Sequence, residues 1–351
     1  MNKANFNKYI LKIFYSDILD KIKLPQNIEQ SISNAEKLLQ IEINNIKLDN
    51  DNFLSNKLNF TYNKDLYKNK PGLNKDNYSK LLADSSISDK DKIKYIIAQK
   101  IISYYSNSNF LLNHFLIPDN GENESRLTIK QWYNYKIYYQ NSKSGERCPF
   151  CGQNFQILNN ENDEKYYYAD VEHLIPKTKY PQFTFNTYNW IPSCKACNMG
   201  IKGDDFFENI EDFKQALLEI NFSLDSENNL CLYKYIKIQC KKTNYVADYY
   251  NVGSKAIQLF NLYNLKNRAN IIVENCYRVL FNIIKHSDIR SPEFLEKLLE
   301  NIASSNWHEI NDGYSLNNSP QIWQEFIENI LYDECKLMAL WDEVKECNKY
   351  L

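Results

Sequence analysis

Glycine and proline are scarce in this sequence, with 8 and 9 residues respectively in a chain of 351. Both residue types interrupt regular structure, so their scarcity favours helices joined by polar connections. The chain has no glycine-rich loop that could cradle a phosphate, and any ATP-driven step would therefore need another polypeptide. It has no internal repeat either. Its length is enough for a sizeable core and for two or three folding units.

A large net charge and a long apolar run are also missing. The formal net charge is −2, which provides no global electrostatic attraction to nucleic acid, so any contact with DNA must be local or arranged by a partner. No stretch is apolar enough to cross a bilayer, and no apolar targeting segment stands near the start. The nine cysteines suit a reducing compartment better than a disulfide framework. We therefore expect a soluble cytoplasmic protein with no membrane partner.

Four of the cysteines form two Cys-x-x-Cys pairs, Cys148 with Cys151 and Cys194 with Cys197. Two residues between cysteines let a tight turn aim both thiolates at one ion, and two such turns supply the four sulfurs of a tetrahedral zinc site. Gly152 tolerates the positive φ that such a turn needs. The spacing predicts zinc, with four buried reduced cysteines as the alternative. Four thiolates leave no open coordination position, so this zinc would be structural.

Between the two pairs, residues 171–177 are typical of a short strand ending in a proline turn, and they include Glu172 and His173. Neighbours on a strand point to opposite faces, so this carboxylate and this imidazole could serve different partners. Asp170 is either a supporting group behind Glu172 or an exposed carboxylate at the strand end. Asn198 follows the last cysteine, where we expect a helix to begin, and could simply cap that helix.

Together these residues resemble the HNH endonucleases, a family with the ββα-metal fold, and in particular its zinc-bearing branch. The resemblance is carried by Val171-Glu172-His173-x-x-Pro176, then Asn189, then Cys194-x-x-Cys197-Asn198 followed by Lys202-Gly203. Two positions depart from the commoner pattern, because Glu172 stands for aspartate and Asn198 for histidine. Both keep an oxygen donor of the kind that Mg²⁺ or Mn²⁺ prefers.

The resemblance implies a role for each residue. It makes His173 the general base, Glu172 and Asn198 the ligands of a catalytic Mg²⁺ or Mn²⁺, and Asn189 the residue that holds the loop orienting His173. An imidazole has an unperturbed pKa of about 6.5, so it can take a proton from water at cellular pH. The divalent ion would neutralise charge developing on the phosphate and the leaving oxygen. Candidate phosphate contacts are Lys177, Lys195 and Lys202.

A narrower resemblance, over about residues 148–275, is to the HNH nucleases of the Septu and retron antiphage systems. It rests on the same motifs and on Ala256-Ile257-x-Leu259-Phe260-x-Leu262 with Arg268, where Tyr263 stands in place of an expected asparagine. Members of that group act with an ABC/SMC-like ATPase. The resemblance implies such a partner here, which would explain a nuclease that has no basic groove of its own.

Apolar periodicity predicts helices at residues 3–24, from Ser88 onward, and at about 206–220, 254–285, 291–304 and 319–348, with a strand pair within 229–249. Residues 26–85 have broken periodicity, which favours short helices and long loops. The aromatic segment 128–140 fits a helix packed on the zinc module or a surface that stacks on bases. The five remaining cysteines are expected to be small buried residues: Cys231, Cys240, Cys276, Cys335 and Cys347.

The expected fold class is α+β and mostly helical. A central ββα-metal module with a four-cysteine zinc site would occupy residues 141–210. A helical region at 1–140 would recognise a partner or target, and a mainly helical region with a short strand pair would occupy 211–351.

The resemblance thus implies a divalent-metal-dependent endodeoxyribonuclease that is the effector of a bacterial antiphage system. Two alternatives stay open. The same fold could cut RNA, because water is the nucleophile and the 2′ substituent of the sugar takes no part in the reaction. A non-catalytic zinc module could bind nucleic acid or a partner protein, although a purely structural zinc site needs none of Glu172, His173, Asn189 and Asn198.

Overall fold

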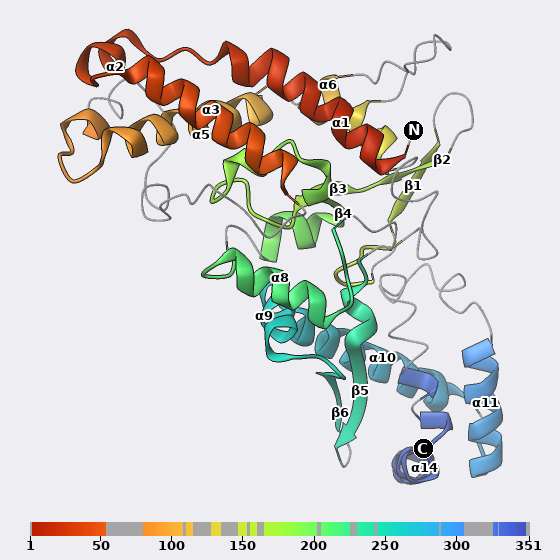
Figure 1. The fold of residues 1–351 in the computed structure, drawn as a ribbon. Coiled ribbons are helices and arrows are strands. Elements are labelled where there is room, and N and C mark those ends of the chain that lie inside the picture. Colours follow the sequence, from red (N-terminus) through yellow and green to blue (C-terminus); the bar gives the residue numbers. More distant parts are fainter. Residues whose placement is uncertain are drawn as a thin grey trace.

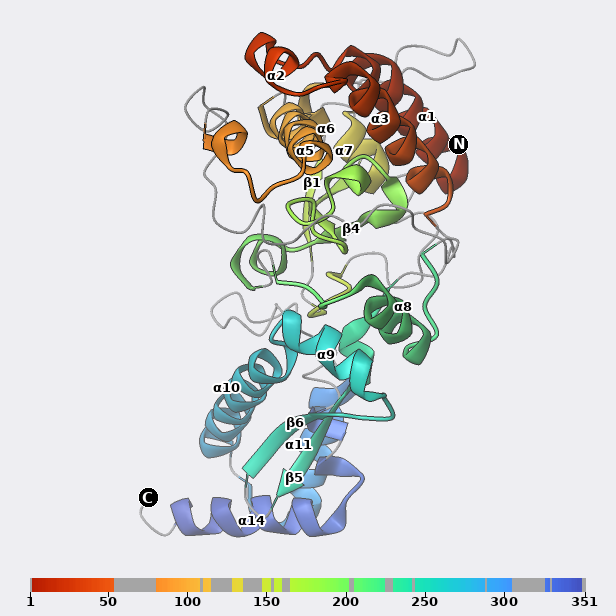
Figure 2. The ribbon, with the colours of Figure 1, turned by 60° about the vertical axis from the view of Figure 1, so that its left-hand side comes forward.

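The computed structural model shows a mostly helical chain with three separate two-stranded antiparallel sheets in the part that it describes. That part comprises residues 2–53, 80–107, 110–114, 128–134, 147–152, 155–159, 165–201, 205–224, 230–241, 244–287, 289–304, 326–328 and 330–348. The N-terminal helices lie at one end and the C-terminal helices at the other, with the hairpin of β3 (Asp170–His173) and β4 (Trp190–Ser193) between them (Figure 1, Figure 2). Among the described residues, no helix combines the length and apolarity that crossing a bilayer requires.

The described N-terminal helices are α1 (Lys3–Ile13), α2 (Gln26–Ser31), α3 (Ala35–Asp51), α5 (Asp89–Asn107), α6 (Phe110–Asn113) and α7 (Ile129–Trp132). The Asn2 side chain caps α1 by accepting a hydrogen bond from the backbone N–H of Asn5 (2.9 Å). A π-helical turn and a 3₁₀ turn continue α1 to residue 21, so the helix expected at 3–24 is confirmed over most of its length. The expectation of only short helices within 26–85 is wrong at α3, which has 17 residues.

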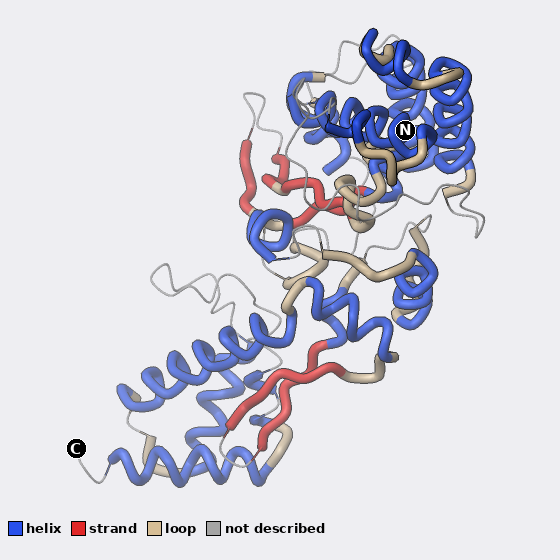
Figure 3. The backbone as a smooth tube through the Cα atoms, turned by 90° about the vertical axis from the view of Figure 1, so that its left-hand side faces the viewer, coloured by secondary structure: helices blue, strands red, loops and turns tan. Residues whose placement is uncertain are grey.

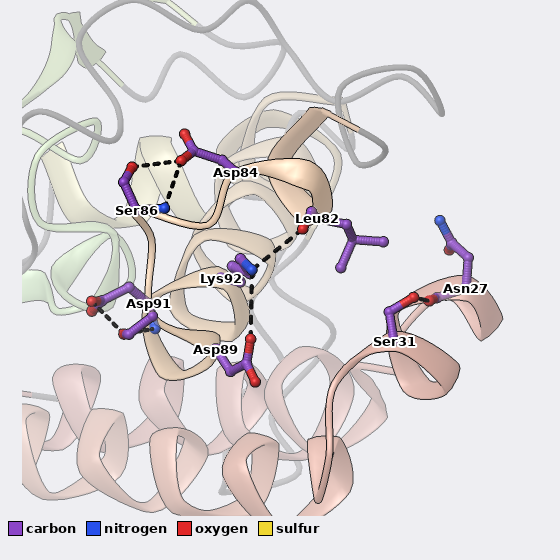
Figure 4. A network of polar contacts seen from close by, with 9 residues as sticks. Asn27, Ser31, Leu82, Asp84, Ser86, Asp89, Asp91 and Lys92 are labelled. Carbon is purple, nitrogen blue, oxygen red and sulfur yellow. Dashed lines mark hydrogen bonds and ion pairs between the residues drawn. The ribbon is translucent and has the colours of Figure 1, made fainter.

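A set of polar contacts fixes the start of α5 (Figure 4). The Ser88 hydroxyl accepts a hydrogen bond from the backbone N–H of Asp91 (3.1 Å) and so caps the helix expected from Ser88 onward. The buried Lys92 side chain donates to the carbonyl of Leu82 (3.4 Å) and pairs with Asp89 (3.5 Å). These contacts tie the first turn of α5 to the segment before it.

Two hairpins form the middle of the chain. β1 (Gln156–Asn159) pairs with β2 (Lys165–Tyr168), and β3 pairs with β4 so that Glu172 lies opposite Ile191 and His173 opposite Trp190. Between β3 and β4 lie two 3₁₀ turns, and a π-helix follows β4; these are η5 (Pro181–Phe183), η6 (Thr187–Asn189) and η7 (Ala196–Ile201). The short strand and proline turn expected at 171–177 are confirmed, since β3 ends at His173 and a turn follows Pro176. Beyond the strand, the backbone of Ile175 bonds to the side chain of Asn189 instead of a partner strand.

The described C-terminal elements are α8 (Ile210–Glu219), η8 (Leu232–Tyr235), β5 (Ile236–Lys241), β6 (Asn244–Tyr249), α9 (Ser254–Leu262), α10 (Leu265–His286), α11 (Pro292–Ser304) and α14 (Glu334–Asn348). The pair β5–β6 and helix α11 confirm their predictions, and Figure 3 shows this strand pair among the helices, apart from β1–β4. The helix expected at 254–285 is divided into α9 and α10, because Asn264 between them is left-handed (φ 49°). Of the helix expected at 319–348, residues 319–325 lie outside the described part.

Two clusters of buried apolar side chains meet at the β3–β4 hairpin. One joins the N-terminal helices to Val171, Phe185 and Trp190. The other contains the four motif cysteines together with Leu174 and Ile191, and it continues into the C-terminal helices. The hairpin therefore contributes to both cores. The division of the chain into three domains at residues 140 and 210 stays a prediction.

The remaining cysteines differ in their burial. Cys276 is buried, as expected, and Cys231 is half-buried. Cys335 is exposed on α14, so the expectation of a buried residue is wrong there. The side chains of Cys240 and Cys347 lie outside the described part.

Candidate metal centre

The four motif cysteines converge on one point. Cys148, Cys151, Cys194 and Cys197 are all buried, and their sulfur atoms lie within 4.8 Å of one another. The Sγ atoms of Cys151 and Cys194 are 3.7 Å apart. A tetrahedron with Zn–S bonds of about 2.3 Å has S···S edges of about 3.8 Å, whereas a disulfide would need about 2.05 Å. The cluster could therefore hold a zinc ion with all four positions filled by sulfur.

Each cysteine pair lies on a tight turn closed by a backbone hydrogen bond. The N–H of Gly152 donates to the carbonyl of Cys148 (2.8 Å), and the N–H of Asn198 donates to that of Cys194 (3.0 Å). Gly152 has φ +74°, and a Cβ there would also lie 3.2 Å from the ring of Tyr233. Only glycine meets both conditions without strain, which agrees with the role that the sequence predicts for it.

The C-terminal helices pack directly on this cysteine cluster. A guanidinium N–H of Arg268, on α10, donates to the sulfur of Cys197 (2.8 Å). The ring of Tyr263, between α9 and α10, stacks on Phe150 in the first cysteine turn, with 4.0 Å between ring centroids. A cationic hydrogen-bond donor beside thiolates favours their charged form, which is the form that binds metal.

Glu172 is buried, with only 5% of its surface exposed. The hydroxyl of Tyr263 donates to its Oε1 atom (3.3 Å). Burial, together with the charge of Glu172, raises the pKa of Tyr263 well above its ordinary value, so the phenol stays protonated and remains a donor. The expected asparagine at position 263 is thus replaced by a residue that contacts the candidate metal ligand.

His173 is oriented by the backbone of the loop that follows β3. Its Nε2 atom lies 2.9 Å from the carbonyl oxygen of Thr184. A carbonyl can only accept, so Nε2 carries a hydrogen, and in the neutral ring the lone pair is then on Nδ1. The imidazole also meets the ring of Tyr105, on α5, edge to face at 5.2 Å. Burial and the charges of Asp170 and Glu172 raise the pKa of Tyr105, so its phenol stays protonated.

Asn189 holds the two ends of the same loop together. Its side chain accepts from the N–H of Ile175 (2.7 Å) and donates to the carbonyls of Ile175 (2.9 Å) and Phe183 (3.4 Å). Asn189 is fully buried, so these three bonds replace contacts with water. Asn189 is predicted to hold the loop that orients His173. These contacts suit that role, because they fix the segment that contains Thr184, whose carbonyl bonds to His173.

Two helices of the N-terminal region, α1 and α3, also form hydrogen bonds to this loop. The Asn7 side chain, on α1, accepts from the backbone N–H of Thr187 (2.7 Å) and from its hydroxyl (2.9 Å). The Asn50 side chain, on α3, donates to the carbonyl of Gln182 (2.7 Å) and accepts from the amide of Asn186 (3.1 Å). All of these contacts are buried.

Residues from the 128–140 segment support the hairpin itself. The Tyr133 hydroxyl donates to the carbonyl of Trp190, and the Asn134 amide donates to that of Ala169 (3.0 Å). Lys130 pairs with Asp170 (2.9 Å). Of the two interpretations of this segment, packing on the module holds for the described residues 128–134; the others lie outside the described part.

A cavity of about 220 Å³ lies beside the centre. Asp170, Lys177 and Asn198 line it, together with Tyr105 and residues from α6. Asn198 follows the start of the helical turn at 195–201 and is not its cap, so that alternative is wrong. Asp170 is not an isolated exposed carboxylate either, since it is paired with a lysine and 21% exposed.

The predicted site residues are thus brought to one region, but not to one surface. Neither Glu172 nor His173 lines the cavity that Asn198 lines. Lys195 is exposed, and Lys202 lies outside the described part. Sequence reasoning missed Tyr105 and the support given by Tyr263, because both are distant in the chain. The departure from the family pattern at 263 was the one available signal.

The comparisons with known proteins find short stretches of similarity. Protein ea31 of Escherichia phage lambda is 36% identical over 84 residues, which is 23% of this chain and 24% of that protein. Septu protein PtuB of Bacillus thuringiensis is 40% identical over 60 residues, 17% of this chain and 20% of that protein. The chain therefore spans only about a quarter or less of the length of these two curated relatives. No family model matches the chain, and no solved structure matches it.

Proposed function

We propose that this protein is a metal-dependent HNH-type endonuclease that hydrolyses phosphodiester bonds of DNA and acts in antiphage defence. The observation that carries the proposal is the contact of His173 Nε2 with the carbonyl of Thr184 (2.9 Å), which leaves Nδ1 as the basic nitrogen. Similarity to a Septu protein supports the defence role. An ABC/SMC-like ATPase would be the partner that delivers the DNA.

His173 would act as general base. Its Nδ1 atom takes a proton from water while the Thr184 carbonyl keeps the ring in place and stabilises the proton on Nε2. Asn189 fixes the loop that carries Thr184, and so acts on the base through the backbone. The buried position of these groups keeps the ring from rotating away, which is the condition for efficient proton transfer.

Glu172 and Asn198 are the residues that would hold the catalytic divalent ion. They come from β3 and η7, which pack against each other, and they offer a carboxylate and an amide oxygen, the donor chemistry that Mg²⁺ and Mn²⁺ prefer. When bound, such an ion supplies charge neutralisation for the phosphate and the leaving oxygen. Tyr263 would orient Glu172 through its hydrogen bond to Oε1.

A cleavage assay tests the substrate class. Labelled plasmid DNA and total tRNA would be incubated with the purified full chain, with Mg²⁺ and Mn²⁺ in turn. The proposal expects plasmid cleavage in at least one of the two ions and little loss of tRNA. Preferential cleavage of tRNA would show an RNA nuclease of the same fold, and no cleavage of either would contradict the hydrolase.

A second candidate function is a zinc module without catalysis, which binds nucleic acid or a partner protein. One observation favours it: Glu172 and His173 do not line the cavity that Asn198 lines. This candidate predicts that His173→Ala leaves phage protection intact, whereas the nuclease predicts that protection is lost.

A further inference from the structure

The cavity beside the candidate centre has a composition that the proposed chemistry does not explain. It holds about 220 Å³, below the roughly 300–1,000 Å³ of typical small-molecule pockets. One part of its wall is apolar and comes from α6 and β3: Phe110, Leu111, Leu112 and Val171. The other part is polar, with two lysines against one aspartate. A wall of this kind fits a ligand with a flat apolar face and an attached anion.

The two lysines are held in place within the structure. Lys130 pairs with Asp170 at 2.9 Å. The ammonium of Lys177 stands over the ring of Tyr105, 5.4 Å from its centroid, in a cation–π contact. Lys177 lies on the turn that follows β3, and the Tyr105 ring beneath its ammonium also contacts the imidazole of His173 (5.2 Å between ring centroids).

The cavity opens to solvent and reaches the proposed metal ligand. Leu112 in its wall is 50% exposed, and Ser106 is also exposed. Asn198 lines the same cavity. A group bound there would therefore enter from the surface and lie next to Asn198, one of the two residues proposed to hold the catalytic ion.

We infer that this cavity binds one unpaired nucleotide of the DNA strand being cut, next to the cleaved bond. This inference rests on the proposed function. The base packs on the apolar wall from Leu111 and Leu112, and Lys177 contacts the adjoining phosphate. A base that is still paired in a duplex cannot enter a space of this size, so the strand must be single or the base turned out of the helix. Stacking and apolar contact are tolerant of sequence, so the site selects unpaired strands rather than a particular base.

The test uses the full chain carrying His173→Ala, so that the strand is bound but not cut, with Mg²⁺ present. Single-stranded DNA oligonucleotides carry one 2-aminopurine at successive positions and an end label whose anisotropy reports total binding. The fluorescence of 2-aminopurine should rise severalfold at one or two neighbouring positions, because the base leaves its stack there.

Two matched variants locate the effect. Leu112→Asp puts a carboxylate into the cavity wall, whereas Leu218→Asp makes the same change at an exposed leucine (67%) on α8, which is not part of the cavity lining. Because both leucines are exposed, both variants should fold. We expect the local fluorescence rise to be lost in Leu112→Asp and kept in Leu218→Asp.

Each other outcome overturns a different statement. Binding without a local rise, or with an equal rise in both variants, overturns the nucleotide subsite and leaves the nuclease standing. A rise with an RNA oligonucleotide but none with DNA overturns the assignment to DNA. No binding, with no cleavage of DNA by the unaltered protein, overturns the proposed function and the subsite with it.

Discussion

The backbone carbonyl of Thr184 fixes the orientation of the His173 imidazole. Its carbonyl accepts hydrogen bonds from two buried rings, His173 through Nε2 and Trp190 through Nε1, both at 2.9 Å. A carbonyl oxygen has two lone pairs, and both are used here. The imidazole is therefore held in one orientation, with a hydrogen on Nε2. Whatever displaces the Thr184 carbonyl should alter the orientation of the imidazole, even if His173 itself is unchanged.

Replacing Asn189 should show how strongly the loop depends on one side chain. Asn189→Ala removes three buried hydrogen bonds and leaves the N–H and carbonyl of Ile175 without their partner. The expected cost is about 2–4 kcal/mol in the free energy of unfolding. Urea denaturation would measure it. Asn267→Ala, at an exposed asparagine on α10, is the control and should cost less than about 0.5 kcal/mol. Equal effects of the two substitutions would refute the role given to Asn189.

At the scale of elements, helices from both the N-terminal and the C-terminal parts of the chain form hydrogen bonds to the hairpin, its loop and the cysteine cluster. Asn7 and Asn50 bond the loop from α1 and α3, and Tyr263 and Arg268 reach the centre from the α9–α10 junction and α10. The N-terminal helices thus help to hold His173 in place, because they bond the loop that contains Thr184. The sequence also suggests a recognition role for them.

Some of these elements could be predicted from the sequence, and some could not. The cysteine turns and the β5–β6 pair have local signals, namely fixed spacing and runs of β-formers. Helix α3 has no such signal, because its inner face carries Glu42, Asp49 and Asn50 while Ile41 and Leu48 are exposed. Buried polar groups paired across long distances break the apolar period on which the prediction of a helix depends.

The cysteine turns should depend on zinc. The full chain should contain one zinc ion, and Cys194→Ser should lose it and unfold at a lower temperature, because a hydroxyl is a poor substitute for a thiolate ligand. Metal analysis and thermal unfolding would measure both effects. Cys276→Ser changes a buried cysteine outside the cluster and should keep the zinc. If the unaltered protein carried no zinc, or both variants kept it equally, the zinc site would be wrong.

For the whole molecule, two apolar cores share one small hairpin, so stability and site geometry are linked. Tyr133 connects the N-terminal core to the hairpin. It is fully buried, stacks on Phe6 of α1 and donates a hydrogen bond to the carbonyl of Trp190 in β4. The aromatic pattern of residues 128–140 predicted packing, but it could not identify Tyr133 as the link, because the residues that Tyr133 contacts are distant in the chain. Its interactions also make the fold sensitive to alkaline pH.

Burial raises the pKa of Tyr133 above its ordinary value of about 10. Above pH 10 the unfolded chain loses this proton and the folded chain keeps it, so the unfolded state binds fewer protons and the free energy of unfolding falls. The contribution of one such group is up to about 1.4 kcal/mol per pH unit. Tyr133→Phe should be less stable at pH 8 and should approach the unaltered protein above pH 10. Denaturation at several pH values checks this, with exposed Tyr250→Phe as control; parallel curves for Tyr133→Phe and the unaltered protein would contradict it.

The most direct test of the central claim is the cleavage rate of supercoiled plasmid DNA by the unaltered chain and by His173→Ala, in Mg²⁺ and in Mn²⁺. Removal of a general base should lower the rate by about 10²–10⁴-fold, while the zinc content stays the same and the chain stays folded. His114→Ala, at a histidine outside the centre that bonds the Phe110 carbonyl, should retain the rate. Equal cleavage by the unaltered chain and His173→Ala, or no cleavage by either, would contradict the account.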